Sequence, residues 1–169
     1  WNDGFPLILA ADHASAGGTI AGIKATYPKK RLGVVWIDAH SDIHTPYTTP
    51  SGNMHGMPLA TVLNVDNLEF KRNELDADVV TLWEELKSIG IKGPKIKPED
   101  LVFIGVRDTE SEEDALISNL NIKNHTVESI RKNGVEVITN AVLDQLKECD
   151  LIYVSFDVDS MNPNDTSLG

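Results

Sequence analysis

The amino-acid sequence predicts an α/β fold with a mostly parallel sheet flanked by helices, and two observations support this prediction. Five short apolar runs rich in β-branched residues recur along the 169-residue chain. Stretches with helical signals fill the gaps between these runs. Four of the five runs are almost continuously apolar, a pattern typical of strands that helices cover on both faces. Strands that alternate with helices predict an α/β domain.

The predicted strands are short, and each ends in a cluster of polar residues. Val135–Thr139 alternates between apolar and polar residues more than the others do. We therefore expect this run to be a shorter strand or one nearer an edge of the sheet. The other four predicted strands are Pro6–Ala11, Gly33–Ile37, Leu101–Val106 and Leu151–Phe156.

Helical signals occur in five stretches. Ala14–Tyr27 is rich in small residues that suit close helix packing, and Pro28 marks its end. Asp76–Gly90 places several apolar side chains, Trp83 among them, on roughly one face and ends at a glycine, as many helices do. The remaining predicted helices are Glu112–Leu120, Thr126–Asn133 and Asn140–Glu148.

Composition excludes several classes of protein. Fifteen lysines and arginines against 26 aspartates and glutamates give a net charge of −11, which argues against binding to nucleic-acid phosphates. No apolar stretch approaches the roughly 18 residues that span a bilayer, so we expect no membrane partner. The single cysteine, Cys149, excludes a disulfide framework and a cysteine-based zinc site. A reducing compartment such as the cytoplasm is the simplest setting for a protein with one unpaired cysteine. The length of the chain suits a single domain over residues 1–169.

Metal-ligand residue types follow three of the predicted strands. In an open parallel sheet, ligands bind at the carboxyl ends of the strands. Side chains two residues apart on an extended chain point to the same side, so each cluster projects its groups together. Such groups would repel one another in one small space unless cations held them. The six candidate metal ligands are His13, Asp38, His40, Asp42, Asp157 and Asp159.

The make-up of this set indicates two metal ions. Four carboxylates balance the charge of two divalent ions, and a single catalytic ion rarely takes six protein ligands. Oxygen and imidazole ligands without thiolate favour Mn²⁺, with Fe²⁺, Co²⁺ or Zn²⁺ as alternatives. Two ions about 3.5–4 Å apart can hold a bridging water and lower its pKa enough to supply hydroxide at neutral pH. Asp12, next to His13, is expected to cap a helix or orient a ligand.

Three segments resemble the ureohydrolase family, and within it the arginases. They are Ala10–Ile23 (AADHASAGGTIAGI), Trp36–Ala60 (WIDAHSDIHTPYTTPSGNMHGMPLA) and Val154–Pro163 (VSFDVDSMNP). The T-P…S-G-N-x-H-G string in the second segment points to arginase rather than to agmatinase-like members. The resemblance implies a three-layer α/β sandwich with a mostly parallel sheet. It also implies hydrolysis of L-arginine to L-ornithine and urea by a hydroxide that bridges two manganese ions.

The resemblance assigns roles to the candidate ligands, with two Mn²⁺ ions per subunit. One ion would be held by His13, Asp38, Asp42 and Asp157, and the other by His40, Asp38, Asp157 and Asp159. Asp38 and Asp157 would therefore bridge the two ions. In the catalytic step, Asp159 would accept a proton from the bridging group, and His55 matches the proton-shuttling histidine near the mouth of the family's active site.

Substrate contacts are implied in the same way. Ser51 and Asn53 match residues that bind the α-carboxylate, and Gly105–Glu113 (GVRDTESEE) resembles the segment that recognises the α-amino group, here through Glu110 and Glu113. The sequence departs from the family where His44 replaces an asparagine as a carboxylate contact, and where Glu110 replaces an aspartate. These departures leave the identity of the substrate open. His125 is expected to be solvated beside a helix.

Several alternatives therefore stay open. The protein is an arginase, another ureohydrolase of the agmatinase, guanidinobutyrase or formimidoylglutamase type, or a non-catalytic arginase-like binding protein. A deacetylase-like site with one zinc ion is disfavoured, because His13 and Asp159 supply ligands for a second ion. The resemblance implies a small guanidino substrate and a homo-oligomer, either a trimer or a hexamer. The family's guanidinium-binding glutamate would lie after Gly169, so we expect this chain to lack N-terminal and C-terminal parts of a longer protein.

Overall fold

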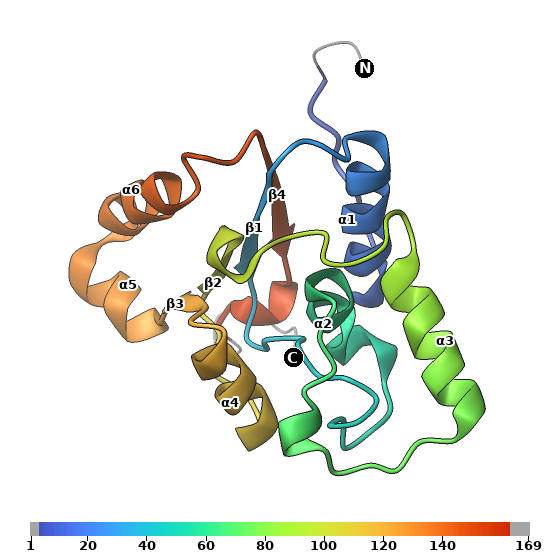
Figure 1. The fold of residues 1–169 in the computed structure, drawn as a ribbon. Coiled ribbons are helices and arrows are strands. Elements are labelled where there is room, and N and C mark those ends of the chain that lie inside the picture. The colour runs from blue at the N-terminus through green and yellow to red at the C-terminus, as the bar shows by residue number, and fades with distance from the viewer. Residues whose placement is uncertain (1–3, 163–169) are drawn as a thin grey trace.

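Four parallel strands form one sheet at the centre of the protein, as a computed structural model that describes residues 4–162 shows (Figure 1). Their order in the sheet is β3-β2-β1-β4. The strands are β1 (Leu32–Ile37), β2 (Leu101–Ile104), β3 (Lys123–His125) and β4 (Leu151–Phe156). The parallel pairing of β1 with both β2 and β4 confirms the predicted class of sheet.

Helices cover the sheet on both faces and give three layers, as predicted (Figure 1). One layer contains α1 (Ala14–Thr26), α2 (Pro58–Leu63), α3 (Ala77–Ser88) and α4 (Ser111–Asn119), and the other contains α5 (Val127–Asn133) and α6 (Val135–Gln145). Four short 3-10 helices complete the described elements: η1 (Met54–Gly56), η2 (Leu68–Phe70), η3 (Pro98–Asp100) and η4 (Val158–Ser160).

The apolar runs of the central strands supply the core on both sides of the sheet. Val34 and Trp36 of β1 are fully buried under the layer that contains α1 and α2. Val35, between them, faces the opposite layer, where it packs with Ile138 and Val142 of α6. Because successive side chains of a strand point to opposite faces, a strand covered on both sides must be apolar at nearly every position.

One edge of the sheet is less covered than its centre. The outer strand β4 carries three apolar side chains whose residues are 46%, 51% and 57% exposed, namely Ile152, Val154 and Phe156. In the register of the sheet they lie beside Gly33, Val35 and Ile37 of β1, on the face that α6 covers elsewhere. Within residues 4–162, no other strand pairs with the outer side of β4.

Two predicted strands are wrong. Val135–Thr139 belongs to α6, where Ile138 and Val142 are buried at helical spacing while Val135 is exposed. The predicted helix Asn140–Glu148 is therefore the second part of a helix that starts earlier, directly after Gly134 with its positive φ of 84°. Pro6–Ala11 is in no strand, and its apolar side chains are exposed. A strand needs a hydrogen-bonding neighbour, and this segment has none among the described residues.

Strand β3 was not predicted from the sequence. It has only three residues, Lys123–His125, two of which are not buried, so no apolar run marks it. The other predicted helices agree with the structure to within about two residues at each end, as α1, α3, α4 and α5 do. Among residues 4–162, none of the helices has the length and apolar character that crossing a bilayer requires.

A close approach of α3 to α1 fixes the position of α1. Gly90, just after α3, has a φ of 81°, and a Cβ atom at this position would collide with the backbone carbonyl of Ala21 in α1. Further along α1, a Cβ atom on Gly17 would lie 3.2 Å from Thr61 Oγ1 of α2. Small residues therefore let α1 pack tightly against two neighbouring helices.

Candidate metal centre

The six predicted metal ligands meet at the carboxyl edge of the sheet. Asp38, His40 and Asp42 follow β1, and Asp157 and Asp159 follow the adjacent strand β4. The backbone N–H of Asp157 donates to the carbonyl of Ile37, which places the ends of the two strands side by side. His13 reaches the same place from the start of α1. All twelve predicted site residues line one cavity there.

His13 lies at the centre of three carboxylates. Its Nδ1 atom is 2.9 Å from Asp42 Oδ2 and 3.0 Å from Asp38 Oδ2. The same atom is 3.2 Å from Asp157 Oδ2. Both Nδ1 and Asp38 Oδ2 are buried, and neither has a hydrogen-bond partner among residues 4–162. A cation that these atoms ligate would satisfy them, so this donor set fits a divalent metal ion.

The other side of the His13 ring is held in place. Its Nε2 atom lies 2.7 Å from Oγ of the buried Ser155 in β4. The ring stacks on the indole of Trp36, with centroids 4.1 Å apart and planes 9° apart. When Nε2–H donates to Ser155, the lone pair of Nδ1 faces the carboxylates. A hydrogen bond at the other ring nitrogen is the usual arrangement of a metal-ligating histidine.

A second group of ligand atoms adjoins the first. His40 Nδ1 is 2.9 Å from Asp159 Oδ2 and 3.6 Å from Asp38 Oδ1. The described residues thus provide two sets with the spacing of metal ligands, His13 with Asp38 and Asp42, and Asp38 with His40 and Asp159. Asp38 belongs to both sets through different oxygens. This sharing is the geometry expected of a bridging carboxylate.

The crowding of these groups changes their affinity for protons. Burial opposes protonation of His13, but the contacts with Asp38 and Asp42 outweigh it and raise its pKa to about 10. Burial also raises the pKa of Asp42, although His13 acts in the opposite direction. At His40, burial again opposes a rise in pKa that Asp159 and Asp38 produce. Without a cation, the cluster therefore retains protons to offset its negative charge.

A tight turn brings Asp42 back toward the sheet edge. Its φ of 48° lies in the left-handed region, which non-glycine residues seldom adopt. The carbonyl of Asp42 accepts a hydrogen bond from the backbone N–H of Leu59 at the start of α2. The turn thus directs the Asp42 carboxylate toward His13 while the following loop runs on to α2.

Two predicted contacts with the substrate, His44 and Glu110, line the same cavity and touch each other. His44 is buried, and both of its ring nitrogens have partners: Nδ1 lies 3.0 Å from Thr48 Oγ1, and Nε2 lies 2.9 Å from Glu110 Oε2. The hydrogen bond with His44 lowers the pKa of Glu110. Among described residues, His44, Glu110 and Glu113 are also spaced closely enough to ligate a metal ion, but hydrogen bonds within the protein already occupy them.

Glu113 connects α4 to the loop after β1. It accepts a hydrogen bond from the hydroxyl of Ser41 at 2.5 Å and another from the backbone N–H of Glu110 at 3.1 Å. The second bond is part of a capping box at the start of α4. Burial raises the pKa of Glu113, and the hydrogen bond from Ser41 opposes this rise. Glu113 thus helps to build the wall of the cavity.

A second wall of the cavity is the loop that leads to η1. Ser51 and Asn53 are exposed there, and the hydroxyl of Ser51 accepts a hydrogen bond from the backbone N–H of Asn53. His55 is also exposed, with Nδ1 3.9 Å from Asp12 Oδ2. The other oxygen of Asp12 accepts a hydrogen bond from the backbone N–H of Ala14 at the start of α1. Asp12 therefore supports the helix start, as expected, and faces His55.

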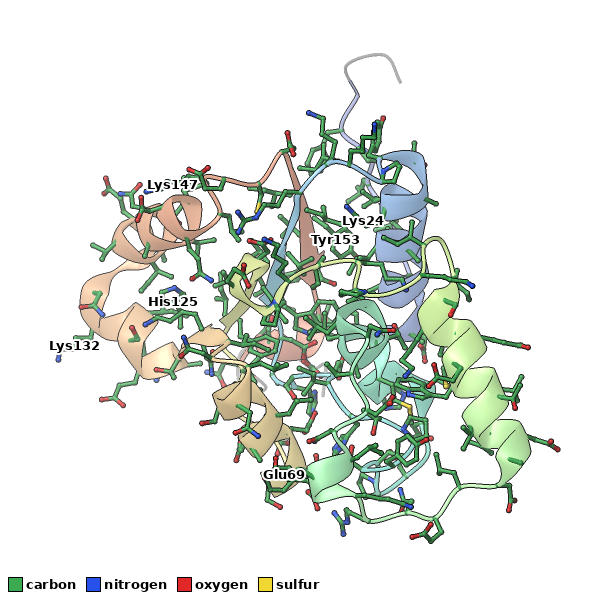
Figure 2. The ribbon with its side chains drawn as sticks, viewed as in Figure 1. Lys24, Glu69, His125, Lys132, Lys147 and Tyr153 are labelled. Carbon is green, nitrogen blue, oxygen red and sulfur yellow. The ribbon has the colours of Figure 1, made fainter. Side chains whose placement is uncertain are left out.

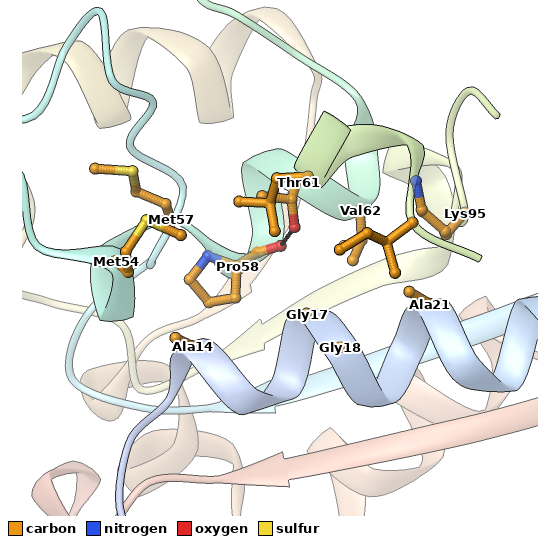
Figure 3. Close-up of a pocket in the computed structure, with 12 residues that line it drawn as sticks. Ala14, Gly17, Gly18, Ala21, Met54, Met57, Pro58, Thr61, Val62 and Lys95 are labelled. Atoms are coloured by element: carbon orange, nitrogen blue, oxygen red, sulfur yellow. Dashed lines mark hydrogen bonds between the residues drawn. The ribbon is translucent and has the colours of Figure 1, made fainter. Parts of the chain in front are cut away.

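A separate, mostly apolar pocket lies between α1 and α2 (Figure 3). The small residues Ala14, Gly17 and Ala21 of α1 face Pro58, Thr61 and Val62 of α2 across it. The hydroxyl of Thr61 donates to the carbonyl of Pro58 at 2.7 Å, so this side of the pocket offers little polar chemistry. We interpret the pocket as part of the packing that positions His13, which immediately precedes α1.

The sequence did not predict three polar contacts of the site. Ser155 and Thr48 hold the rings of His13 and His44, and Ser41 holds Glu113. Ser155 is the one polar residue in the apolar run of β4 and stands two positions before Asp157, which is a signal that could have identified it. Thr48 and Ser41 lie in loops rich in hydroxyl side chains, where nothing in the pattern distinguishes them.

Comparison with known proteins identifies relatives of this chain. The model of the Arginase family matches residues 2–167, which confirms the resemblance seen in the sequence. The chain is 38% identical over 161 residues to an arginase of Bacillus subtilis, a match that covers 95% of this chain and 48% of that protein. The chain therefore spans about half the length of the curated relatives it matches.

Solved structures agree with this relationship. The crystal structure of Helicobacter pylori arginase matches with a TM-score of 0.81 and 37% identity, over 95% of this chain and 51% of that one. A formimidoylglutamase from Bacillus subtilis matches with a TM-score of 0.68 and 24% identity, over 94% of this chain and 40% of that one. At this lower identity, the second likeness supports the fold alone.

Proposed function

Since this chain belongs to the arginase family, we propose that the protein hydrolyses the guanidinium group of L-arginine to L-ornithine and urea, with two Mn²⁺ ions as cofactors. The observation that carries this proposal is the pair of ligand sets that share Asp38 at the carboxyl edge of the sheet. The buried Nδ1 atom of His13, which lacks a hydrogen-bond partner, supports it further.

The ligands would divide between the two ions as the resemblance to the family implies. His13, Asp38, Asp42 and Asp157 would hold one ion, and Asp38, His40, Asp157 and Asp159 would hold the other. When bound, two divalent ions lower the pKa of water so that hydroxide is available near neutral pH. The imidazole nitrogens and carboxylate oxygens of this set, which contains no thiolate, favour Mn²⁺.

Asp159 and His55 would then carry out the proton transfers of the reaction. Asp159 is partly exposed and faces the cavity beside His40, where its carboxylate would accept the proton released by the attacking nucleophile. His55, exposed in η1 near Asp12, would donate a proton to the departing amine of ornithine. Protonation is needed because an amine anion is a poor leaving group.

The two walls of the cavity would orient the amino-acid end of the substrate. Ser51 and Asn53 offer neutral hydrogen-bond donors for an α-carboxylate. Glu110 and Glu113 offer negative charge for an α-ammonium group, and the many carboxylates of the cavity would attract a cationic guanidinium. We also propose a homo-oligomer, either a trimer or a hexamer, that works in the cytoplasm; sedimentation of the full-length protein tests the oligomeric state.

A second candidate, another ureohydrolase, is favoured by the contacts of His44. Both ring nitrogens of His44 are engaged, by Thr48 and by Glu110, so the ring would have to give up a partner before it could bind a substrate carboxylate. A site that depends less on the carboxylate would prefer decarboxylated guanidino compounds such as agmatine.

A substrate panel separates these functions. The full-length protein with Mn²⁺ is given L-arginine, agmatine, guanidinobutyrate and formiminoglutamate in turn, and kcat/KM is measured for each. The highest value with L-arginine is the expected result, and preference for another substrate would select the second candidate. Binding of Mn²⁺ without turnover of any substrate would identify a non-catalytic binding protein. Asp38→Asn should abolish turnover, while Asp78→Asn, on the exposed side of α3, is the matched control.

A further inference from the structure

Arg107 connects two strand ends that are not neighbours in the sheet. It lies in the loop after β2, which carries none of the six predicted metal ligands. Its Nη1 atom donates to the carbonyl of Gly105 at 3.1 Å, at the end of β2. Nη2 donates to the carbonyl of Asp159 at 3.0 Å, and Nη1 also donates to that of Ser160 at 3.4 Å, both in η4 after β4. The guanidinium thus spans the end of β1, which lies between β2 and β4.

Backbone hydrogen bonds at Ala39 complete this connection. The carbonyl of Ala39 accepts from the backbone N–H groups of Arg107 and Asp108 at 2.9 and 3.0 Å. The N–H of Ala39 donates to Asp159 Oδ1 at 3.2 Å. Asp159 is therefore held at its carbonyl by Arg107 and at its carboxylate by Ala39. Three chain segments far apart in sequence are linked around one candidate metal ligand.

The two ligand sets differ in how they are held. His13, in the first set, is fixed by stacking on Trp36 and by its contact with the buried Ser155. In the second set, the side chains of His40 and Asp159 are 48% and 33% exposed. Packing therefore does little to fix Asp159, and hydrogen bonds must set its orientation.

We propose that Arg107 is a positioning residue that holds Asp159 in place for the metal ion of the Asp38–His40–Asp159 set. This inference rests on the proposed two-ion function. Arg107 touches neither the carboxylate oxygens of Asp159 nor the other ligands, and acts through the backbone of η4. Its forked guanidinium reaches carbonyls on both segments at once, which a lysine ammonium cannot do with the same geometry. Its removal should weaken one ion and spare the other.

Titration with Mn²⁺ tests this directly in the full-length protein. Binding of Mn²⁺ is followed by the EPR signal of the free ion and by metal analysis after dialysis, and thermal unfolding is recorded in parallel. The wild-type protein should bind two ions. In Arg107→Ala, we expect the affinity for one ion to fall about 10–100-fold, the range typical when an outer hydrogen-bond partner of a ligand is lost, and that for the other to stay unchanged.

Two further variants define the role of the side chain. Arg107→Lys keeps the positive charge without the fork, and we expect it to weaken the same ion. Arg131→Ala, on the exposed side of α5, is the control and should bind both ions normally.

The outcomes separate the inference from the function on which it rests. Wild-type affinity for both ions in Arg107→Ala or in Arg107→Lys would overturn the positioning role alone. Equal weakening of both ions together with a lower Tm would also overturn it, because that result indicates a general structural role. A wild-type protein that binds fewer than two ions would overturn the proposed function and the inference together.

Discussion

The imidazole of His13 lies flat on the indole of Trp36, and Ser155 Oγ lies 2.7 Å from its outer nitrogen. The ring is thus clamped by a core side chain from β1 and by a hydroxyl from β4. Its inner nitrogen has little freedom to turn away from the carboxylates. The candidate metal centre is therefore organised by the sheet itself and does not depend only on the loops that follow the strands.

Removal of the hydroxyl should loosen this arrangement. In Ser155→Ala, His13 loses the partner that orients its ring, and we expect Mn²⁺ affinity at the His13 set to fall about 10–100-fold. Metal analysis after dialysis against graded Mn²⁺ measures the change. Ser88→Ala, at the exposed end of α3, is the control. Unaltered Mn²⁺ affinity in Ser155→Ala would show that stacking on Trp36 suffices.

Replacement of the imidazole should separate the two ions. His13 belongs to one ligand set and not to the other. We expect His13→Asn to weaken one ion and to leave the ion near His40 and Asp159 bound. Metal content near one ion per chain at moderate Mn²⁺ is the predicted result, and two tightly bound ions would contradict the assignment of His13 as a ligand.

Binding of Mn²⁺ should stabilise the fold. A ligand present at about 100 times its Kd adds about 2.7 kcal/mol to the free energy of unfolding when it binds only the native state. We therefore expect Tm to rise with added Mn²⁺ and to fall again with a chelator, as thermal scans of the full-length protein would record. Asp38→Asn, which removes the shared carboxylate, should lose most of this rise. An equal rise in that variant would indicate that Mn²⁺ binds elsewhere.

A buried histidine outside the site should make stability depend on pH. We expected His125 to be solvated, but it is 7% exposed, and its buried Nε2 atom has no hydrogen-bond partner in the part of the chain that the structure describes. His125 is the last residue of β3, and Figure 2 shows it next to α5. Burial and, to a lesser degree, Lys123 lower its pKa below the ordinary 6.5.

The direction of the effect follows from proton uptake. Because unfolded His125 binds a proton more readily than folded His125 does, the stability it contributes is present above about pH 6.5 and declines as the pH falls below that value. Urea unfolding at pH 8 and pH 5 should show a smaller loss of stability in His125→Phe than in the wild-type protein. The same loss in both would contradict this role.

Two glycines with similar backbone angles should respond differently to alanine. Gly90 and Gly93 both have φ near 80°, but only Gly90 abuts another helix, at Ala21. The left-handed backbone alone should cost Gly93→Ala about 1–2 kcal/mol. Gly90→Ala should cost about 1–3 kcal/mol more, because its Cβ must displace α1. Chemical denaturation measures both, and equal losses would mean that α1 adjusts without cost.

The sequence predicted the centre of the fold better than its margins. β1 and β2 stand out because strands covered on both faces must be continuously apolar. Val135–Thr139 has the same residue types, yet it forms the start of α6, because its buried positions continue at helical spacing to Val142. Polar β3 could not be recognised from three residues. Tertiary contacts decide such segments, and local pattern does not.

The candidate site was likewise predictable only in part. The residues Asp38, His40 and Asp42 alternate at the end of one strand, so their convergence follows from strand geometry alone. The partners that orient them come from distant segments. His13 and Ser155 are 142 residues apart, and Arg107 reaches η4 from 52 residues away. No spacing rule connects such pairs, and only the folded chain brings them together.

The outer side of β4 has a consequence for handling this chain in solution. Among the described residues, no strand pairs with the backbone groups on this side of β4. The side chains of Ile152, Val154 and Phe156 on the same strand are about half exposed. An apolar edge of this kind adds strands from other molecules and drives aggregation. A lysine in place of Val154 would put a charge in the middle of that edge and should keep the 169-residue chain dispersed at higher concentration.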